Sequence, residues 1–197
     1  MMRIITGKAR GVRLNTLPGE NTRPTSERAK EAVFSMLQFE LADARVLDLF
    51  AGSGQMGLEA ISRGAREAVF CDASREAVKV IESNLIKTRL ALQGEVLCMD
   101  YTKALQGFRR KKQFDLVFLD PPYALGAIPE ALRLLTSYGL LAPSAKLVCE
   151  TGSERDVFGE DQALERQFQV LRATRYGVAY VTVLQYEAQT DGEGGAL

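Results

Sequence analysis

The sequence of 197 residues contains no histidine, and its three cysteines form no C-x-x-C motif. The lack of imidazole excludes histidine-activated nucleophiles, histidine general bases and histidine metal ligands. Cys71, Cys98 and Cys149 each follow an apolar run, and their odd number indicates reduced thiols in the core. We therefore expect a protein whose chemistry uses neither a metal ion nor a disulfide.

Long apolar runs are also missing. No stretch approaches the ~18 consecutive apolar residues that a membrane-spanning helix needs. The first residues, MMRIITGKARG, carry positive charge without the apolar segment that follows it in a secretory signal. These features predict a cytoplasmic protein with no membrane partner, and nothing in the sequence demands more than a monomer.

The net charge is zero, but the charge is unevenly distributed. Residues 1–30 contain seven Lys or Arg residues and two Glu, a net charge of +5, which leaves −5 on the remainder. A basic arm on an acidic body indicates a polyanionic partner, because phosphate contacts need Lys and Arg on one surface. A solvated terminus explains the same count equally well.

Apolar strand patterns alternate with helical patterns from residue 44 onward. The helical patterns cover residues 74–90 and 127–139, and the predicted strands are 44–50, 67–72, 94–100, 114–120, 145–150 and a closing hairpin over 168–187. This alternation predicts an α/β, Rossmann-like fold with a mostly parallel, seven-stranded sheet and an antiparallel edge hairpin. Before it we expect a small β-hairpin and an amphipathic helix capped by Thr25 or Ser26.

The segment VLDLFAGSGQMGLEA leads from a strand through glycines into a helix. Gly52, Gly54 and Gly57 satisfy G-x-G-x-x-G, and Asp72 ends the next strand, a spacing typical of dinucleotide binding. Asp48 argues against a dinucleotide, because a carboxylate beside the loop would repel a pyrophosphate. It favours S-adenosylmethionine, a ligand with an ammonium, a sulfonium and a ribose.

Acidic residues also end the second and third predicted strands. Asp72 suits the ribose hydroxyls, and Asp100 suits the adenine amino group. Carboxyl ends of neighbouring strands are where open α/β sheets bind ligands. An ordinary α/β turn with incidental acids is the alternative, and three acids on successive strand ends make it the weaker one.

The tetrapeptide Asp120-Pro121-Pro122-Tyr123 ends the fourth strand pattern. Its prolines remove backbone donors and leave carbonyl acceptors, Asp120 adds another acceptor, and Tyr123 offers a face for stacking. Such a set suits the amino group of a nucleobase that has left its stack. Methylation at C5 of a pyrimidine would need a cysteine nucleophile, whereas these cysteines lie within strands. We therefore expect in-line methylation of an amino group, positioned by these residues.

DLFAGSG with LDPPY resembles the S-adenosylmethionine-dependent amino-methyltransferases. RIITGKARGVRL followed by TRPTSERAKEAVFSML is similar to the bacterial 16S ribosomal RNA guanine-N2 methyltransferase family. That resemblance implies a class I methyltransferase fold and methylation of N2 of one guanine in 16S rRNA, within a 30S subunit or an assembly intermediate. It divides the chain into a basic arm (1–22), a methyltransferase domain (23–186) and a flexible acidic tail (187–197).

The resemblance also implies roles for individual residues. The predicted catalytic residues are Asp120, Pro121, Pro122 and Tyr123. The predicted cofactor-binding residues are Asp48, Phe50, Ala51, Gly52, Gly54, Asp72, Asp100, Tyr101 and Thr25. The predicted RNA-binding residues are Lys8, Arg10, Arg13, Arg23 and Tyr123.

Other functions remain open at this point. A methyltransferase for adenine N6 in DNA or for a protein glutamine uses similar tetrapeptides, and only the arm and first helix argue against it. A non-catalytic RNA-binding assembly factor would not need acids at each cofactor position. An NAD-dependent oxidoreductase is opposed by Asp48.

Overall fold

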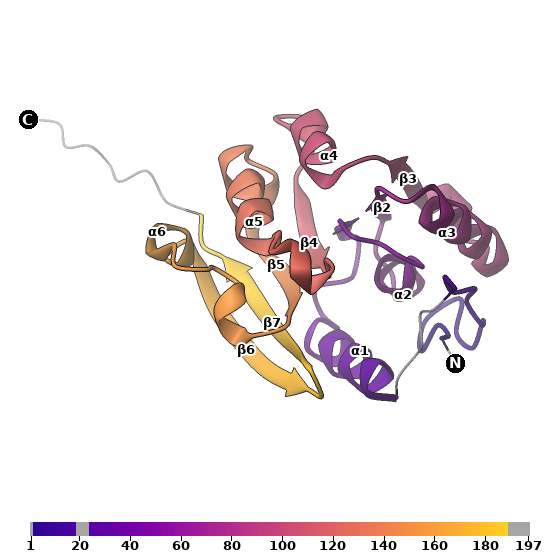
Figure 1. Cartoon of the computed structure of the whole chain (residues 1–197). Coiled ribbons are helices and arrows are strands. Elements are labelled where there is room, and N and C mark those ends of the chain that lie inside the picture. Colours follow the sequence, from indigo (N-terminus) through magenta and orange to yellow (C-terminus); the bar gives the residue numbers. More distant parts are fainter. Residues whose placement is uncertain (1, 19–23, 189–197) are drawn as a thin grey trace, which may run out of the picture.

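The computed structural model describes residues 2–18 and 24–188, and seven strands in that part form one sheet (Figure 1). The strand order is β3-β2-β1-β4-β5-β7-β6. The strands are β1 (Arg45–Asp48), β2 (Glu67–Asp72), β3 (Gly94–Cys98), β4 (Phe114–Leu119), β5 (Leu141–Thr151), β6 (Phe168–Tyr176) and β7 (Ala179–Tyr186).

The first five strands are parallel, whereas β7 pairs antiparallel with both β5 and β6. This arrangement confirms the predicted Rossmann-like fold class with its antiparallel edge hairpin. The strand order reverses at β1, which pairs with β2 on one side and β4 on the other. Open α/β sheets bind ligands at such a reversal, at the carboxyl ends of the strands.

Helices cover both faces of the sheet (Figure 1). They are α1 (Pro24–Met36), α2 (Gln55–Ser62), α3 (Arg75–Thr88), α4 (Tyr101–Phe108), α5 (Ile128–Ser137) and α6 (Gln162–Glu165). One core cluster joins α1, α2 and α3 to the sheet, and a second joins α4, α5 and α6 to the opposite face. Burial on both faces explains the continuous apolar runs of β1 and β4. No helix in the described ranges is long and apolar enough to cross a membrane.

The helix starts follow from local side-chain chemistry, and two of them correct the sequence predictions. The third strand ends at Cys98 rather than at residue 100, because Asp100 caps α4 by accepting the Thr102 N–H at 2.9 Å. Helix α1 begins at Pro24, so Thr25 and Ser26 lie inside its first turn and do not precede it. Proline suits that first position because its φ is already helical and the missing donor costs nothing there.

The amino-terminal segment, residues 2–18, reverses direction but forms only an isolated bridge between Arg3 and Arg13 in place of two strands. The predicted hairpin is therefore present only as a paired loop. Its apolar side chains are buried in the same core cluster as α1, α2 and α3: Met2, Ile4, Ala9 and Leu14. The described part of the predicted arm thus packs on the domain.

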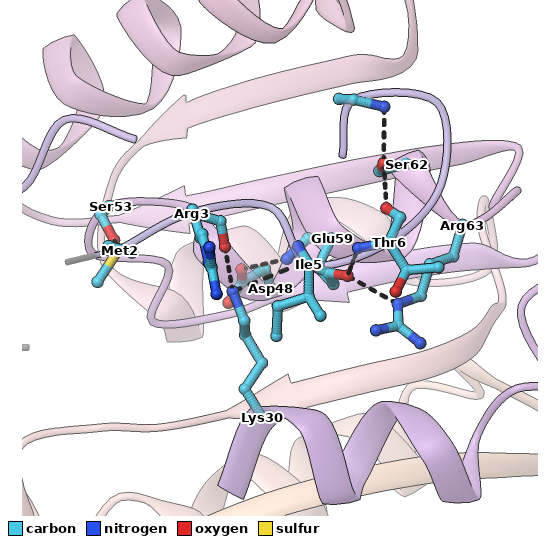
Figure 2. A network of polar contacts seen from close by, with 12 residues as sticks. Met2, Arg3, Ile5, Thr6, Lys30, Asp48, Ser53, Glu59, Ser62 and Arg63 are labelled. Atoms are coloured by element: carbon cyan, nitrogen blue, oxygen red, sulfur yellow. Dashed lines mark hydrogen bonds and ion pairs between the residues drawn. The ribbon is translucent and has the colours of Figure 1, made fainter. Parts of the chain in front are cut away.

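A buried acid, Glu59 of α2, holds this segment in place (Figure 2). Its two carboxylate oxygens accept the N–H of Ile5 at 2.8 Å and of Thr6 at 3.0 Å. Arg63 donates to it at 2.8 Å, and the Lys30 ammonium of α1 lies 3.6 Å away. We call these five residues the Glu59 clasp. It joins the amino-terminal segment, α1 and α2 through one fully buried charge.

Candidate active site

One cavity of about 610 Å³ opens at the carboxyl ends of the central strands. Its lining combines the glycine loop after β1 with the loop after β4, so Asp48 and Tyr123 face the same space. The loop after β1, predicted to bind the methyl donor, and the loop after β4, predicted to bind the acceptor amino group, therefore line one cavity. Eleven predicted residues line the cavity: Asp48, Phe50, Ala51, Gly52, Asp72, Asp100, Tyr101, Asp120, Pro121, Pro122 and Tyr123.

Asp48 is the most perturbed acid of the cavity. It ends β1 with 4% of its surface exposed, and its Oδ2 accepts the Gly57 N–H at 2.9 Å. Burial raises its pKa to about 7, the nearby charge of Asp72 adds to the rise, and the bond from Gly57 opposes it. A cationic group in the cavity would favour the charged form of this carboxylate.

The glycines of the loop have different functions. Gly52 adopts a positive φ of 52°, lines the cavity and donates its N–H to Asp72 Oδ2 at 2.9 Å. Gly54 also has a positive φ, but it faces the side chains of Ile81 and Phe70 and does not line the cavity. A Cβ on Gly57 would lie 2.3 Å from the Phe70 ring, so only glycine lets α2 approach β2 this closely. Gly54 therefore packs against α3 and β2, and its predicted contact with a cofactor stays a prediction.

Asp72 and Asp100 both have a structural function besides facing the cavity. Asp72 accepts the N–H groups of Gly52 and Ser74, which fixes its carboxylate between the glycine loop and the start of α3. Hydrogen bonds from Thr102 lower the pKa of Asp100, so that acid is charged. The described lining contains these two acids, Asp48 and Asp120, and no Lys or Arg. Such a cavity favours a cation and disfavours phosphate.

Aromatic rings form one wall of the cavity. Phe50 and Tyr101 have ring centroids 5.1 Å apart, and the Tyr101 hydroxyl donates to Glu130 at 2.6 Å. That bond and burial raise the pKa of Tyr101, with burial as the larger cause, so the hydroxyl stays protonated. The pair offers a flat apolar surface beside Asp100.

The tetrapeptide Asp120–Tyr123 forms the facing wall. Tyr123 begins a short 3₁₀ turn and lies 45% exposed, and its hydroxyl donates to Glu150 at the end of β5 at 2.8 Å. The hydrogen bond anchors the ring, which lines the cavity. Glu150 was not anticipated from the sequence, since only the pairing of β4 with β5 brings it beside Asp120.

The basic residues predicted to bind RNA, as far as the structure describes them, lie away from the cavity, unlike Tyr123. The Lys8 ammonium contacts Gln93 just before β3, and its backbone N–H donates to Ser62 at the end of α2. Both neighbours mark the amino ends of the strands, so Lys8 lies away from the cavity. Arg10 and Arg13 are exposed on the same segment and do not line the cavity. Arg23 lies outside the described residues, and Thr25 lies in the first turn of α1.

The two buried cysteines, Cys71 and Cys149, are poorly suited to nucleophilic chemistry. Burial raises the pKa of Cys71 to about 12, with Asp72 adding to the rise, and burial also raises the pKa of Cys149. Neither thiol is ionised near neutral pH.

Solved structures define the class to which this fold belongs. An RNA methyltransferase of Salinibacter ruber, solved with S-adenosylhomocysteine, has the same fold, with a TM-score of 0.64 at 14% identity over 88% of this chain and 100% of that one. The Escherichia coli protein YhhF superposes with a TM-score of 0.82 at 30% identity over 95% of this chain and 99% of that one. The fold and its acid-lined cavity place the protein in the methyltransferase class.

Sequence comparison gives the family. The family described as Conserved hypothetical protein 95 matches residues 2–185. Ribosomal RNA small subunit methyltransferase D of Haemophilus influenzae is 34% identical over 78% of this chain and 80% of its own length. The protein of the same name from Escherichia coli is 34% identical over 78% of this chain and 76% of its own length. The chain belongs to the family that these rRNA methyltransferases represent. The predicted family and the predicted enzyme class, an S-adenosylmethionine-dependent rRNA methyltransferase, are therefore confirmed.

Proposed function

We propose that the protein uses S-adenosylmethionine to methylate the exocyclic N2 amino group of one guanine in 16S rRNA. The observation that carries the proposal is the shared cavity, in which a cation-favouring glycine loop faces a wall of hydrogen-bond acceptors. The names of the relatives support an rRNA substrate. We further propose that it acts as a cytoplasmic monomer on a 30S subunit or an assembly intermediate.

The residues present fit the cofactor. Asp48 would hold the ammonium, Asp72 the ribose hydroxyls and Asp100 the adenine side, with Phe50 and Tyr101 against the ring. Gly52 leaves room for close approach of the ligand to the backbone. S-adenosylmethionine supplies an electrophilic methyl group on a sulfonium. The positive charge of that ligand matches a lining that contains four aspartates.

The wall opposite would hold the nucleophile. An exocyclic amine is weakly nucleophilic because its lone pair is delocalised into the ring. The Asp120 carboxylate and the neighbouring carbonyl acceptors would bind the N–H groups, which disfavours that delocalisation and orients the lone pair. Asp120 would also accept the proton that the amine loses. Tyr123 would stack on the flipped base, a contact worth ~1–3 kcal/mol. Most of the catalytic effect then comes from positioning.

The test compares acceptors with labelled S-adenosylmethionine: naked 16S rRNA, 30S particles, DNA and protein. Label recovered as N2-methylguanosine supports the proposal, and the better of the two rRNA forms identifies the natural substrate. Label in N6-methyladenine of DNA or in glutamine would refute it. Binding of S-adenosylmethionine without transfer to any acceptor would favour a non-catalytic assembly factor.

Asp120 provides a sharper test of the assigned roles. Replacing Asp120→Ala should lower kcat at least ~100-fold, since it removes an acceptor at the reacting nitrogen, the order that general acid–base groups contribute. Affinity for the cofactor, measured by calorimetry, should change only a few-fold. Asp120→Asn, which keeps one acceptor oxygen, should retain intermediate activity. An equal loss of turnover and cofactor affinity would mean that Asp120 belongs to the cofactor site.

We also propose that Lys8, Arg10 and Arg13 bind rRNA phosphates at a distance from the reacting base. Replacing all three by Ala should weaken RNA binding and reduce the slope of log K against log salt by up to about 3. Cofactor affinity should not change, because none of the three lines the cavity. An unchanged salt slope would show that they form only a solvated surface.

A further inference from the structure

A second, smaller cavity of about 120 Å³ adjoins the main one. The two share Gln55, Met56 and Asp120, so Asp120 borders both spaces. The walls of the small cavity are largely apolar and come from α1, β4, β5 and β7, with Val33, Phe118, Val148 and Val181 among them. A space of this kind next to the acceptor wall suits a flat, mostly apolar ring.

Glu150 is the second acid of this small cavity. It follows Cys149, which pairs with Leu119 in the parallel register of β4 and β5, so Asp120 and Glu150 continue neighbouring strands side by side. Side chains alternate along a strand. Glu150 therefore shares the face of Val148, and Asp120 shares the face of Phe118, both of which pack in the cluster under α1. The fold places two carboxylates at the entrance to one apolar space.

The orientation of Glu150 is fixed by its neighbours. Its Oε1 accepts the Tyr123 hydroxyl at 2.8 Å. The nearby cation, Lys30, is already occupied, since it donates to the Arg3 carbonyl at 2.8 Å and pairs with Glu59 at 3.6 Å (Figure 2). The carboxylate of Glu150 thus lines the small cavity while the Tyr123 hydroxyl holds one of its oxygens in place.

Guanine presents the chemistry that such a carboxylate recognises. Its N1–H and its N2 amino group are adjacent donors on one edge. Adenine, by contrast, has an acceptor at N1 beside its amino group. Two adjacent carboxylates could accept the N1–H and the amino hydrogens of guanine, whereas adenine N1 would face a negative charge without a proton between them.

We propose that Glu150 is a specificity-determining residue that accepts the N1–H of the target guanine while Asp120 holds its amino group. This inference rests on the proposed function and deepens it. The small cavity receives the ring, and Glu150, which Tyr123 holds from the adjoining main cavity, reads the Watson–Crick edge. A carboxylate that merely anchored Tyr123 would have no effect on the choice of base.

The variant Glu150→Gln separates recognition of the base from anchoring of Tyr123. The amide keeps an oxygen for the Tyr123 hydroxyl, but it can also present an N–H, which repels guanine N1–H and suits adenine N1. We expect kcat/KM for N2-methylguanosine formation to fall roughly 10- to 100-fold, the range of one good base contact. Glu150→Asp, which keeps the carboxylate, should recover part of the loss and all of the preference for guanine. Glu154→Gln, the same change at an exposed position, is the control.

The assay uses 16S rRNA and 30S particles from cells lacking this methylation, labelled S-adenosylmethionine, and digestion to nucleosides. The ratio of N6-methyladenosine to N2-methylguanosine should rise for Glu150→Gln and stay unchanged for Glu150→Asp. Cofactor affinity should change less than two-fold, because Glu150 does not line the main cavity. Melting curves confirm that each variant folds.

Failure of the proposed function and failure of the Glu150 assignment would give different results. If the wild-type protein forms no N2-methylguanosine, the proposed function is wrong. If it does, but Glu150→Gln keeps its kcat/KM within two-fold and its product ratio, the function stands and the assignment of Glu150 is overturned. Equal losses for Glu150→Gln and Glu150→Asp, with guanine as the only product, would also overturn it, because the carboxylate would then not be what selects the base.

Discussion

Removing the Glu59 carboxylate should destabilise the protein far more than removing a surface acid. In Glu59→Ala, the N–H groups of Ile5 and Thr6 lose their acceptor, and the Lys30 ammonium, 3% exposed, loses its counter-charge. Burial already lowers the pKa of Lys30, and Glu59 opposes that shift. Breaking a buried pair by deleting one partner costs about 3–5 kcal/mol. We expect that loss in the free energy of unfolding.

For a chain of this size the change corresponds to a fall of roughly 6–20 °C in melting temperature. Urea titration followed by circular dichroism should show a lower midpoint with an unchanged m value. The matched control is Glu67→Ala, which removes an exposed partner of Arg45 at 3.4 Å and should cost less than about 1 kcal/mol.

The clasp also predicts a partial rescue. Adding Lys30→Met to Glu59→Ala removes the unpaired buried charge and should recover part of the lost stability, because an apolar side chain tolerates the same surroundings. If Glu59→Ala costs no more than Glu67→Ala, the carboxylate does not hold the amino-terminal segment. The account of the clasp would then be wrong.

Two further predictions concern the glycine loop. Because the pKa of Asp48 is raised to about 7 in the folded state, the stability it contributes is fully present below pH ~4 and is lost as the pH rises to ~7. Asp48→Asn should remove this pH dependence, which is on the order of 4 kcal/mol in urea titrations, and an unchanged slope would show that other groups cause it. Gly57→Ala should cost about 1–3 kcal/mol in melting experiments through its clash with Phe70, whereas Gly107→Ala, with nothing within 4 Å, should be neutral or stabilising.

The sheet and most of the cavity were predictable because their signals are local. Apolar runs marked the strands, and an acid directly after a run marked a cavity residue, as with Asp48, Asp72 and Asp120. The carboxyl ends of parallel strands meet at one edge, so these acids had to converge.

The remaining features depend on contacts that sequence spacing does not encode. Glu59 lies 54 residues from Ile5, and its burial follows only from how the amino-terminal segment lies on α2. Glu150 becomes part of a site only through the register of β4 with β5. Gly54 satisfies a ligand motif, yet its φ of +77° and the nearby Ile81 give it a packing function.

The four aspartates around the cavity affect what leaves it as well as what enters. In the proposed reaction the donor loses its sulfonium charge together with its methyl group. The spent molecule is therefore held less strongly by the same carboxylates than the fresh one. The acidic lining would thus favour the replacement of S-adenosylhomocysteine by S-adenosylmethionine after every turnover.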